Sequence, residues 1–175
     1  MLAIEVGSTF EVKPLKINSY DSEQTQLLGS HLGKLAQKGD VFLLMGDLGT
    51  GKTCLTQGIT QGLGAKEPAL SPSFVIVRQY HGRLPLYHID LYRLDHIEEI
   101  ANLGLDEYLY SDGICVVEWP EKGLQLLPES NLLIKLSYAP ECETKRIIHL
   151  EPKGERYSEL IRQLKPALDT DRTWN

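Results

Sequence analysis

Residues 41–53 read VFLLMGDLGTGKT, an apolar run followed directly by a loop rich in glycine. The run from Val41 to Met45 is typical of a strand that is buried on both faces of a parallel sheet. The loop fits the pattern GxxxxGK(S/T) at every required position, and residues 53–63 are expected to continue as a helix. A strand, this loop and a helix in that order predict a phosphate-binding P-loop.

Each part of this loop has a chemical reason to bind a nucleoside triphosphate. Glycines let backbone N–H groups turn toward the phosphates without a clash from Cβ, and the next helix adds the positive end of its dipole. Lys52 can reach the β- and γ-phosphate oxygens, and Thr53 can offer its hydroxyl to Mg²⁺. The alternative is a glycine-rich turn without a ligand. The residues expected to bind ATP are Gly46, Asp47, Leu48, Gly49, Thr50, Gly51, Lys52 and Thr53.

The rest of the chain alternates between predicted helices and strands, which is typical of an α/β protein. Apolar residues at helical spacing predict helices over residues 21–37, 96–103 and 155–168. Short apolar or alternating runs predict strands over residues 74–80, 86–90, 114–118, 131–138 and 145–151. The last two strands are expected to pair as an antiparallel hairpin.

The expected fold is therefore a single α/β P-loop NTPase domain over residues 1–168. Its mostly parallel central sheet is flanked by helices and carries the C-terminal antiparallel hairpin. A length of 175 residues suits one domain. Residues 169–175 are polar and are expected to form a flexible tail.

The composition disfavours several classes of protein. A net charge of −6 argues against a protein that coats DNA or RNA, because neutralising phosphates requires a concentrated basic surface. No apolar run reaches the length needed to cross a bilayer, and the amino terminus lacks the pattern of a signal peptide. The three cysteines, Cys54, Cys115 and Cys142, lack the spacing of a zinc site. We expect a cytoplasmic protein that contacts neither membrane nor DNA.

Two predicted strands end in a carboxylate. Asp90 follows the apolar run that begins at Leu86, and Glu118 follows the run that begins at Ile114. Parallel strands would deliver both side chains to the edge that carries the P-loop, where such groups hold Mg²⁺ and position the attacking water. We expect Asp90 and Glu118 to act in catalysis and metal binding, together with Lys52. The alternative for either carboxylate is a helix cap or an ion pair, and for Asp90 the partner would be Arg93.

Two further features are less specific. Ser71 and Ser73, in Ser71-Pro72-Ser73, lie where switch elements of P-loop proteins often sense the γ-phosphate, although such a segment is also a common turn. His88 lies on a predicted buried strand, and we expect a packed, hydrogen-bonded core histidine rather than a base.

Four segments, in this order and spacing, resemble the bacterial TsaE (YjeE) family: residues 46–53, 71–74, 88–94 and 118–121. The resemblance covers roughly residues 20 to 150. It implies an ATPase that assists in making N6-threonylcarbamoyladenosine at adenosine 37 of tRNA. In that family the carbamoyl transfer belongs to the partners TsaD and TsaB, so this chain would meet tRNA indirectly, through that complex.

The resemblance also implies roles for individual residues. Trp119 would pack beside the nucleotide, and the stretch from Asp21 to Thr25 matches a family segment that approaches it, with Ser22 and Thr25 as candidate contacts. The chain departs from the family in having Ser73 where Thr is usual and Cys54 where Thr or Ser is usual. Serine keeps the hydroxyl, and neither phosphate nor metal binding requires Cys54.

Other readings remain open from the sequence. A small P-loop kinase would need an arginine-rich lid, and no compact segment of that kind is apparent. A GTPase would carry an NKxD motif, which is absent from the sequence. A binding module that uses ATP only to set its conformation, with negligible hydrolysis, would have the same loop.

Overall fold

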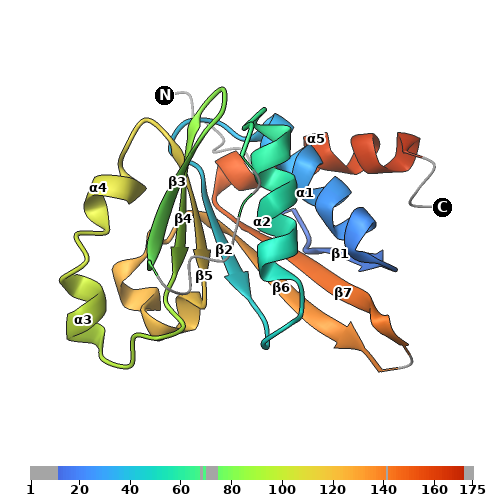
Figure 1. Cartoon of the computed structure of the whole chain (residues 1–175). Helices are drawn as coiled ribbons and strands as arrows, with labels where there is room; N and C mark the ends of the chain where they lie inside the picture. The colour runs from blue at the N-terminus through green and yellow to red at the C-terminus, as the bar shows by residue number, and fades with distance from the viewer. Residues whose placement is uncertain (1–11, 68, 70–74, 141, 172–175) are drawn as a thin grey trace, which may run out of the picture.

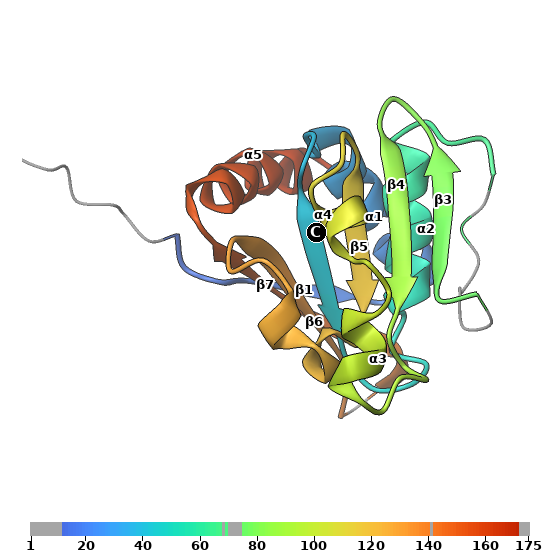
Figure 2. The ribbon, with the colours of Figure 1, turned by 90° about the vertical axis from the view of Figure 1, so that its left-hand side faces the viewer.

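The computed structural model describes residues 12–67, 69, 75–140 and 142–171 (Figure 1). In this part of the chain seven strands form one sheet in the order β1-β7-β6-β2-β5-β4-β3. Four central strands are parallel: β6 (Asn131–Ala139), β2 (Val41–Met45), β5 (Ile114–Glu118) and β4 (Pro85–Asp90). In Figure 2 the arrows of β2, β5 and β4 point toward the same edge. The parallel centre of the sheet is therefore confirmed.

Antiparallel strands flank this centre on both sides. On one side β7 (Cys142–Lys153) pairs with β6, which confirms the predicted hairpin, and β1 (Leu15–Ser19) pairs with β7. On the other side β3 (Val77–His81) pairs with β4. The sheet is thus mixed, with its parallel strands in the middle.

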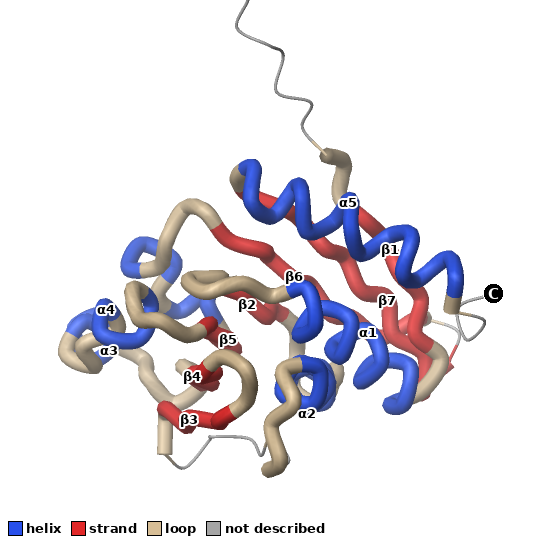
Figure 3. Tube along the Cα trace, turned by 90° about the horizontal axis from the view of Figure 1, so that it is seen from above, coloured by secondary structure: helices blue, strands red, loops and turns tan. Residues whose placement is uncertain are grey.

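Helices cover both faces of the sheet. Apolar side chains of α1 (Ser22–Leu35), α2 (Lys52–Gly62) and α5 (Glu155–Thr170) form one core with alternate residues of the strands. The other core includes residues of α3 (Ile97–Ala101) and α4 (Asp106–Leu109). Two 3₁₀ turns, Pro120–Lys122 and Leu124–Leu126, follow β5. Figure 3 shows β2, β4 and β5 between α3 and α4 on one side and α1 and α2 on the other.

The backbones of α1 and α2 touch, and glycines make this contact possible. A Cβ built on Gly58 would lie 2.0 Å from the carbonyl oxygen of Gln26, and one on Gly29 would lie 2.3 Å from that of Leu55. Gly33 and Gly62 face the opposite helix equally closely. Because α2 begins at the P-loop, this contact also fixes the loop relative to α1.

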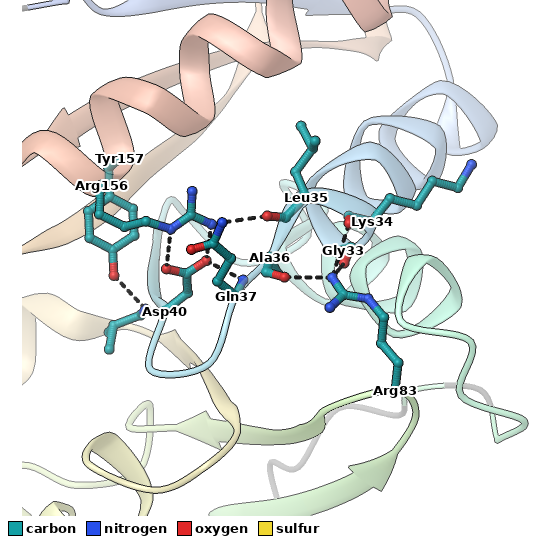
Figure 4. Close-up of polar contacts among 10 residues, drawn as sticks. Gly33, Lys34, Leu35, Ala36, Gln37, Asp40, Arg83, Arg156 and Tyr157 are labelled. Atoms are coloured by element: carbon teal, nitrogen blue, oxygen red, sulfur yellow. Dashed lines mark hydrogen bonds and ion pairs between the residues drawn. The ribbon is translucent and has the colours of Figure 1, made fainter.

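Two arginines hold the segment between α1 and β2 (Figure 4). Arg156 of α5 binds the buried Asp40 with two hydrogen bonds, Nε–Oδ1 at 2.9 Å and Nη2–Oδ2 at 2.6 Å. Arg83 donates to three carbonyl oxygens at the end of α1, those of Gly33, Lys34 and Ala36. These contacts lie at the end of β2 opposite the P-loop, so they fix the start of that strand.

Several boundaries differ from the sequence prediction. Strand β1 and helix α4 were not predicted, because neither has a strong periodic pattern. Strand β3 begins at Val77 rather than at residue 74, since Ile76 has a left-handed φ of 59° that an extended strand excludes; residue 74 lies outside the described residues. Helix α5 extends two residues beyond 168. Within the described ranges, no helix has the length and apolar character to span a membrane.

Candidate functional site

Residues 46–53 connect β2 to α2, as the motif predicts. Gly46, Gly49 and Gly51 all have positive φ angles, of 147°, 79° and 104°. A Cβ on Gly46 would lie 2.3 Å from the carbonyl oxygen of Leu136, and one on Gly49 would lie 2.6 Å from the hydroxyl of Tyr138. Other residues would be strained in these conformations, so the shape of the loop depends on its glycines.

Lys52 lies against the loop that precedes it. Its Nζ donates to the carbonyl oxygens of Gly46 at 2.6 Å and Asp47 at 3.0 Å, and lies 4.0 Å from the centre of the Trp119 ring. Burial lowers the pKa of the Lys52 ammonium from its ordinary value of 10.5. Nearby carboxylates oppose this shift in pKa, in the order Glu118, Glu121, Asp90 and Asp47. The Lys52 ammonium thus lies among carboxylates and is hydrogen-bonded to the glycine loop.

Thr53 and Glu118 meet at the beginning of α2. The Thr53 hydroxyl donates to Glu118 Oε1 at 3.1 Å and lies 3.4 Å from Oε2. Glu118 is the last residue of β5 and only 3% exposed. Because the hydroxyl proton points to the carboxylate, the oxygen lone pairs of Thr53 stay available to a metal ion.

Asp90 lies beside Glu118. The two residues end adjacent parallel strands and are paired in register. Asp90 is 5% exposed, and its Oδ1 accepts a hydrogen bond from the backbone N–H of Tyr92 at 2.9 Å. The structure therefore brings both predicted carboxylates together at the edge of the sheet that carries the P-loop. Asp90 also stabilises the turn that follows β4.

A pocket of about 180 Å³ joins these groups. Its lining includes predicted loop residues, both carboxylates and Trp119, together with Cys54 and Tyr92, which the sequence did not single out as site residues. The residues are Leu48, Gly49, Gly51, Lys52, Thr53, Cys54, Asp90, Tyr92, Glu118 and Trp119. Gly46, Asp47 and Thr50 shape the loop instead: the buried Thr50 hydroxyl donates to the carbonyl oxygen of Asp47 at 2.8 Å.

Trp119 occupies a strained backbone conformation next to Glu118, with φ 59° and ψ 45°. Such angles are uncommon for a residue other than glycine and often mark functional sites. The indole ring packs on Tyr92, with ring centres 4.9 Å apart, and its face receives the Lys52 ammonium. The turn after β5 therefore places Trp119 against Lys52, the lysine that the motif predicts to bind phosphate.

The start of α1 adjoins the loop. Cys54 Sγ lies 3.3 Å from the carbonyl oxygen of Ser22. The buried Thr25 hydroxyl makes hydrogen bonds with Ser19 Oγ at 2.8 Å and with the carbonyl oxygen of Asp21 at 3.1 Å. Ser22 thus contacts Cys54, which lines the pocket. The described partners of the Thr25 hydroxyl instead belong to the segment that leads into α1.

The β6–β7 hairpin supports the loop through two residues that the sequence did not reveal. Tyr138 donates its hydroxyl proton to the carbonyl oxygen of Leu48 at 3.1 Å, and Arg146 Nε donates to that of Thr50 at 3.1 Å. The Arg146 guanidinium lies 4.3 Å from the centre of the Tyr138 ring. No local pattern marks these residues, because their contacts span 90 and 96 positions of the chain.

The predicted switch residues Ser71 and Ser73 lie outside the described residues, so their expected role stays a prediction. His88 is fully buried and hydrogen-bonded, and its Nε2 lies 2.8 Å from Glu118 Oε1. A packed, hydrogen-bonded histidine was expected at this position, but its contact with Glu118 was not.

The chain matches the family described as threonylcarbamoyl adenosine biosynthesis protein TsaE over residues 19–148. The tRNA threonylcarbamoyladenosine biosynthesis protein TsaE of Bacillus subtilis is 40% identical over 154 residues, which cover 87% of this chain and 95% of that protein. TsaE of Treponema pallidum is 42% identical over 118 residues, or 67% of this chain and 87% of that protein.

A solved structure is also similar. The crystal structure of YdiB from Bacillus subtilis aligns with a TM-score of 0.79 at 36% sequence identity, covering 91% of this chain and 99% of that one. The family match includes the P-loop and the strands that carry Asp90 and Glu118. The similarity therefore extends over the whole candidate site.

Proposed function

Because this chain belongs to the TsaE family of threonylcarbamoyl adenosine biosynthesis proteins, we propose that it is a Mg²⁺-dependent ATPase that serves this modification of tRNA. The observation that carries the proposal is the convergence of Lys52, Thr53 and Glu118 on one pocket at the end of a glycine loop. Phosphoryl transfer depends on this combination of a cation, a metal-binding hydroxyl and a carboxylate.

Lys52 would bind the β- and γ-phosphates of ATP. Its present hydrogen bonds to two loop carbonyl oxygens can be exchanged for bonds to phosphate oxygens, which keeps the buried ammonium paired. The backbone N–H groups of residues 46–53 and the beginning of α2 would add further positive charge at the phosphates.

Thr53 and Glu118 would hold Mg²⁺, with Asp90 as the second candidate carboxylate. Their oxygen atoms fit this ion, which usually takes one or two carboxylates and completes its shell with water and phosphate oxygens. When bound, Mg²⁺ neutralises charge that develops on the transferred phosphoryl group. Asp90 and Glu118 would also orient the water that attacks the γ-phosphate.

The remaining predicted residues complete this proposal. Trp119 would shield Lys52 from solvent, and Ser22 and Thr25 would approach the nucleoside from the start of α1. Ser71 and Ser73 would sense the γ-phosphate as a switch. Hydrolysis would then act on a complex of TsaD and TsaB homologues in the cytoplasm, where the chain meets tRNA only indirectly.

A Lys52→Ala variant tests the nucleotide site. We expect Mg²⁺-dependent ATP hydrolysis to fall by about 100-fold or more, because the charge that stabilises the transferring phosphate is lost. Hydrolysis is measured by phosphate release with and without Mg²⁺. The control is Lys38→Ala, an exposed lysine that pairs with Asp112 near the opposite end of β2, which should leave turnover unchanged. Equal turnover in the wild type and in Lys52→Ala would contradict the proposed site.

Reconstitution tests the pathway. The protein is mixed with purified TsaD and TsaB, and tRNA modification is followed over many turnovers with ATP or with a non-hydrolysable analogue. We expect repeated turnover only with ATP. Equal support by the analogue would favour a binding module in which hydrolysis is negligible, and no stimulation at all would leave an ATPase of another pathway.

A further inference from the structure

The hydrogen bond between His88 and Glu118 is the shortest of the three side-chain hydrogen bonds described for this carboxylate. His88 Nε2 lies 2.8 Å from Glu118 Oε1, whereas Thr53 Oγ1 lies 3.1 Å from the same atom. Both partners are almost inaccessible, with the His88 side chain 0% and the Glu118 side chain 4% exposed. The reaction proposed above uses Glu118 and Thr53 but leaves His88 without a role.

The strand register explains how His88 reaches this carboxylate. Side chains alternate along a strand, so His88 and Asp90 of β4 share the face that carries Glu118 of β5. His88 is paired in register with Val116, two residues before Glu118, and so approaches the carboxylate from within the sheet. Thr53 approaches it from the beginning of α2. Two donors from different elements therefore hold the same oxygen atom.

Packing alone does not account for a histidine here. The neighbouring positions on this face, Leu86 and Val116, are fully buried and apolar. His88 Nδ1 is buried and makes no hydrogen bond to any described residue, which costs free energy that an apolar side chain of similar size would avoid. The imidazole is thus retained at a cost to stability, and its one side-chain hydrogen bond among the described residues is to Glu118.

We propose that His88 is a positioning residue: its Nε2–H fixes the Glu118 carboxylate in the orientation in which it accepts the Thr53 hydroxyl and faces the phosphate-binding pocket. This inference rests on the proposed ATPase function, since it assigns His88 to the same site. His88 does not line the pocket and therefore acts through Glu118 rather than on the substrate. Partners of this kind orient metal-binding groups in many proteins, and their loss commonly lowers metal affinity or activity by about 10- to 100-fold.

Two substitutions of His88, with side chains of similar length, distinguish a positioning role from a packing role. In His88→Gln the side-chain amide nitrogen can take the place of Nε2 and donate to Glu118. In His88→Met the volume is similar but the donor is lost. We expect kcat for ATP hydrolysis to fall about 10- to 100-fold in His88→Met and to stay within about 3-fold of wild type in His88→Gln, with similar KM values. Equal kcat values in the two folded variants would overturn the proposal.

Nucleotide binding supplies a readout that is independent of turnover. Calorimetry measures ADP affinity in EDTA and at increasing Mg²⁺. We expect His88→Met to need about 10- to 100-fold more Mg²⁺ for its effect on ADP binding, while the affinity in EDTA stays unchanged. An equal loss of affinity in EDTA would indicate general damage to the fold and would contradict a positioning role.

Magnetic resonance of the wild-type protein covers the case in which a variant fails to fold. In the ¹⁵N-histidine-labelled protein, the His88 signal is assigned by its absence from His88→Gln or, should that variant not fold, by its lack of exchange with solvent. Adding Mg²⁺ to the ADP complex should shift its Nε2 resonance, and an unchanged resonance would overturn the proposal. Failure of the wild type itself to hydrolyse ATP would instead contradict the proposed function.

Discussion

At the residue scale, Glu118 joins several elements at the candidate site, because its carboxylate accepts hydrogen bonds from α2 and from β4. Its position at the end of β5 brings it beside Asp90, which is bound to the backbone of Tyr92. The two carboxylates thus have different surroundings, although they occupy equivalent positions on adjacent strands. Glu118 is held by side chains of the candidate site, and Asp90 also shapes a turn.

Neutral isosteres of the two carboxylates test this assignment. We expect Glu118→Gln to lower kcat about 100-fold or more and Asp90→Asn to lower it as well, because water and metal lose a negatively charged partner. Nucleotide affinity without Mg²⁺ should change little in either variant. Single-turnover hydrolysis and calorimetry measure the two effects separately. Normal hydrolysis in both variants would mean that the carboxylates are only structural.

At the element scale, the position of the P-loop depends on how closely α1 and α2 approach. Gly29 and Gly33 of α1 face Gly58 and Gly62 of α2 with no space for a side chain. Each helix therefore carries two glycines four residues apart, although glycine weakens a helix. The close contact outweighs this loss because it brings α2, and with it Lys52 and Thr53, to one fixed distance from α1.

Gly58→Ala should destabilise the protein although alanine favours helices. The added Cβ would lie 2.0 Å from the carbonyl oxygen of Gln26, so the helices must move apart. We expect the free energy of unfolding to fall by about 1–3 kcal/mol, which exceeds the gain of about 1 kcal/mol in helix propensity. Urea denaturation measures the change. The exposed Gln61→Ala in the same helix should alter stability by less than about 0.5 kcal/mol.

Arg156→Met tests the attachment of α5 to the start of β2. The Asp40 side chain, 3% exposed, would lose its bidentate partner. We expect a loss of about 3 kcal/mol in the free energy of unfolding, reduced to the extent that water reaches the group. In the same helix Arg162→Met removes exposed ion pairs with Glu155 and Glu159 and a 3.4 Å hydrogen bond to the carbonyl oxygen of Ser158, and should cost less than about 1 kcal/mol. Equal losses of stability in the two variants would show that the Arg156–Asp40 pair contributes no more to the free energy of unfolding than exposed ion pairs do.

At the scale of the whole molecule, the sheet separates two polar regions. The P-loop, Asp90 and Glu118 lie at the carboxyl ends of the parallel strands, whereas the Arg156–Asp40 pair lies at the opposite end of β2. Between them the strands are buried on both faces by the two apolar cores. The residues of the candidate site are therefore carried by the buried centre of the sheet, and the hairpin of β6 and β7 supports the loop.

Burial at this centre predicts how stability responds to alkaline pH. Cys115 in β5 is fully buried, and burial raises the pKa of its thiol from 9.0 to about 12. Between these values the unfolded chain loses this proton and the folded protein keeps it. The contribution of the Cys115 thiol to the free energy of unfolding is therefore complete below pH 9. Above pH 9 this contribution falls by about 1.4 kcal/mol per pH unit. The raised pKa of Tyr157, about 12, adds a decline from pH 10.

Cys115→Ala should remove the thiol's part of this decline. Urea denaturation under reducing conditions is expected to show a shallower fall in stability above pH 9 than in the wild type. The exposed Cys142 is the control, since hydrogen bonds from Thr144 lower the pKa of its thiol, so Cys142→Ala should not flatten the decline. If the fall in stability above pH 9 were equally steep in Cys115→Ala and in the wild type, the raised pKa of the Cys115 thiol would be contradicted.

The sequence by itself determined the parts that short continuous patterns encode. The run Val41 to Met45 gave β2 with its observed bounds, and the run ending at Glu118 gave β5. The loop motif predicted Lys52 and Thr53 as site residues because phosphate binding requires those residues at that spacing, and both line the pocket. Local pattern was too weak for β1, whose place is fixed by pairing with β7 rather than by its own residues.

Only the tertiary structure decided which distant residues meet. His88 and Glu118 are separated by 30 positions, and Tyr138 and Leu48 by 90. Such contacts follow from the order and register of the strands, which no local periodicity specifies. The glycines of α1 and α2 likewise acquire their role only when two backbones touch. The candidate nucleotide site could therefore be predicted from the motif, whereas the side chains that contact Glu118 and the loop from distant positions depend on the folding of the whole sheet.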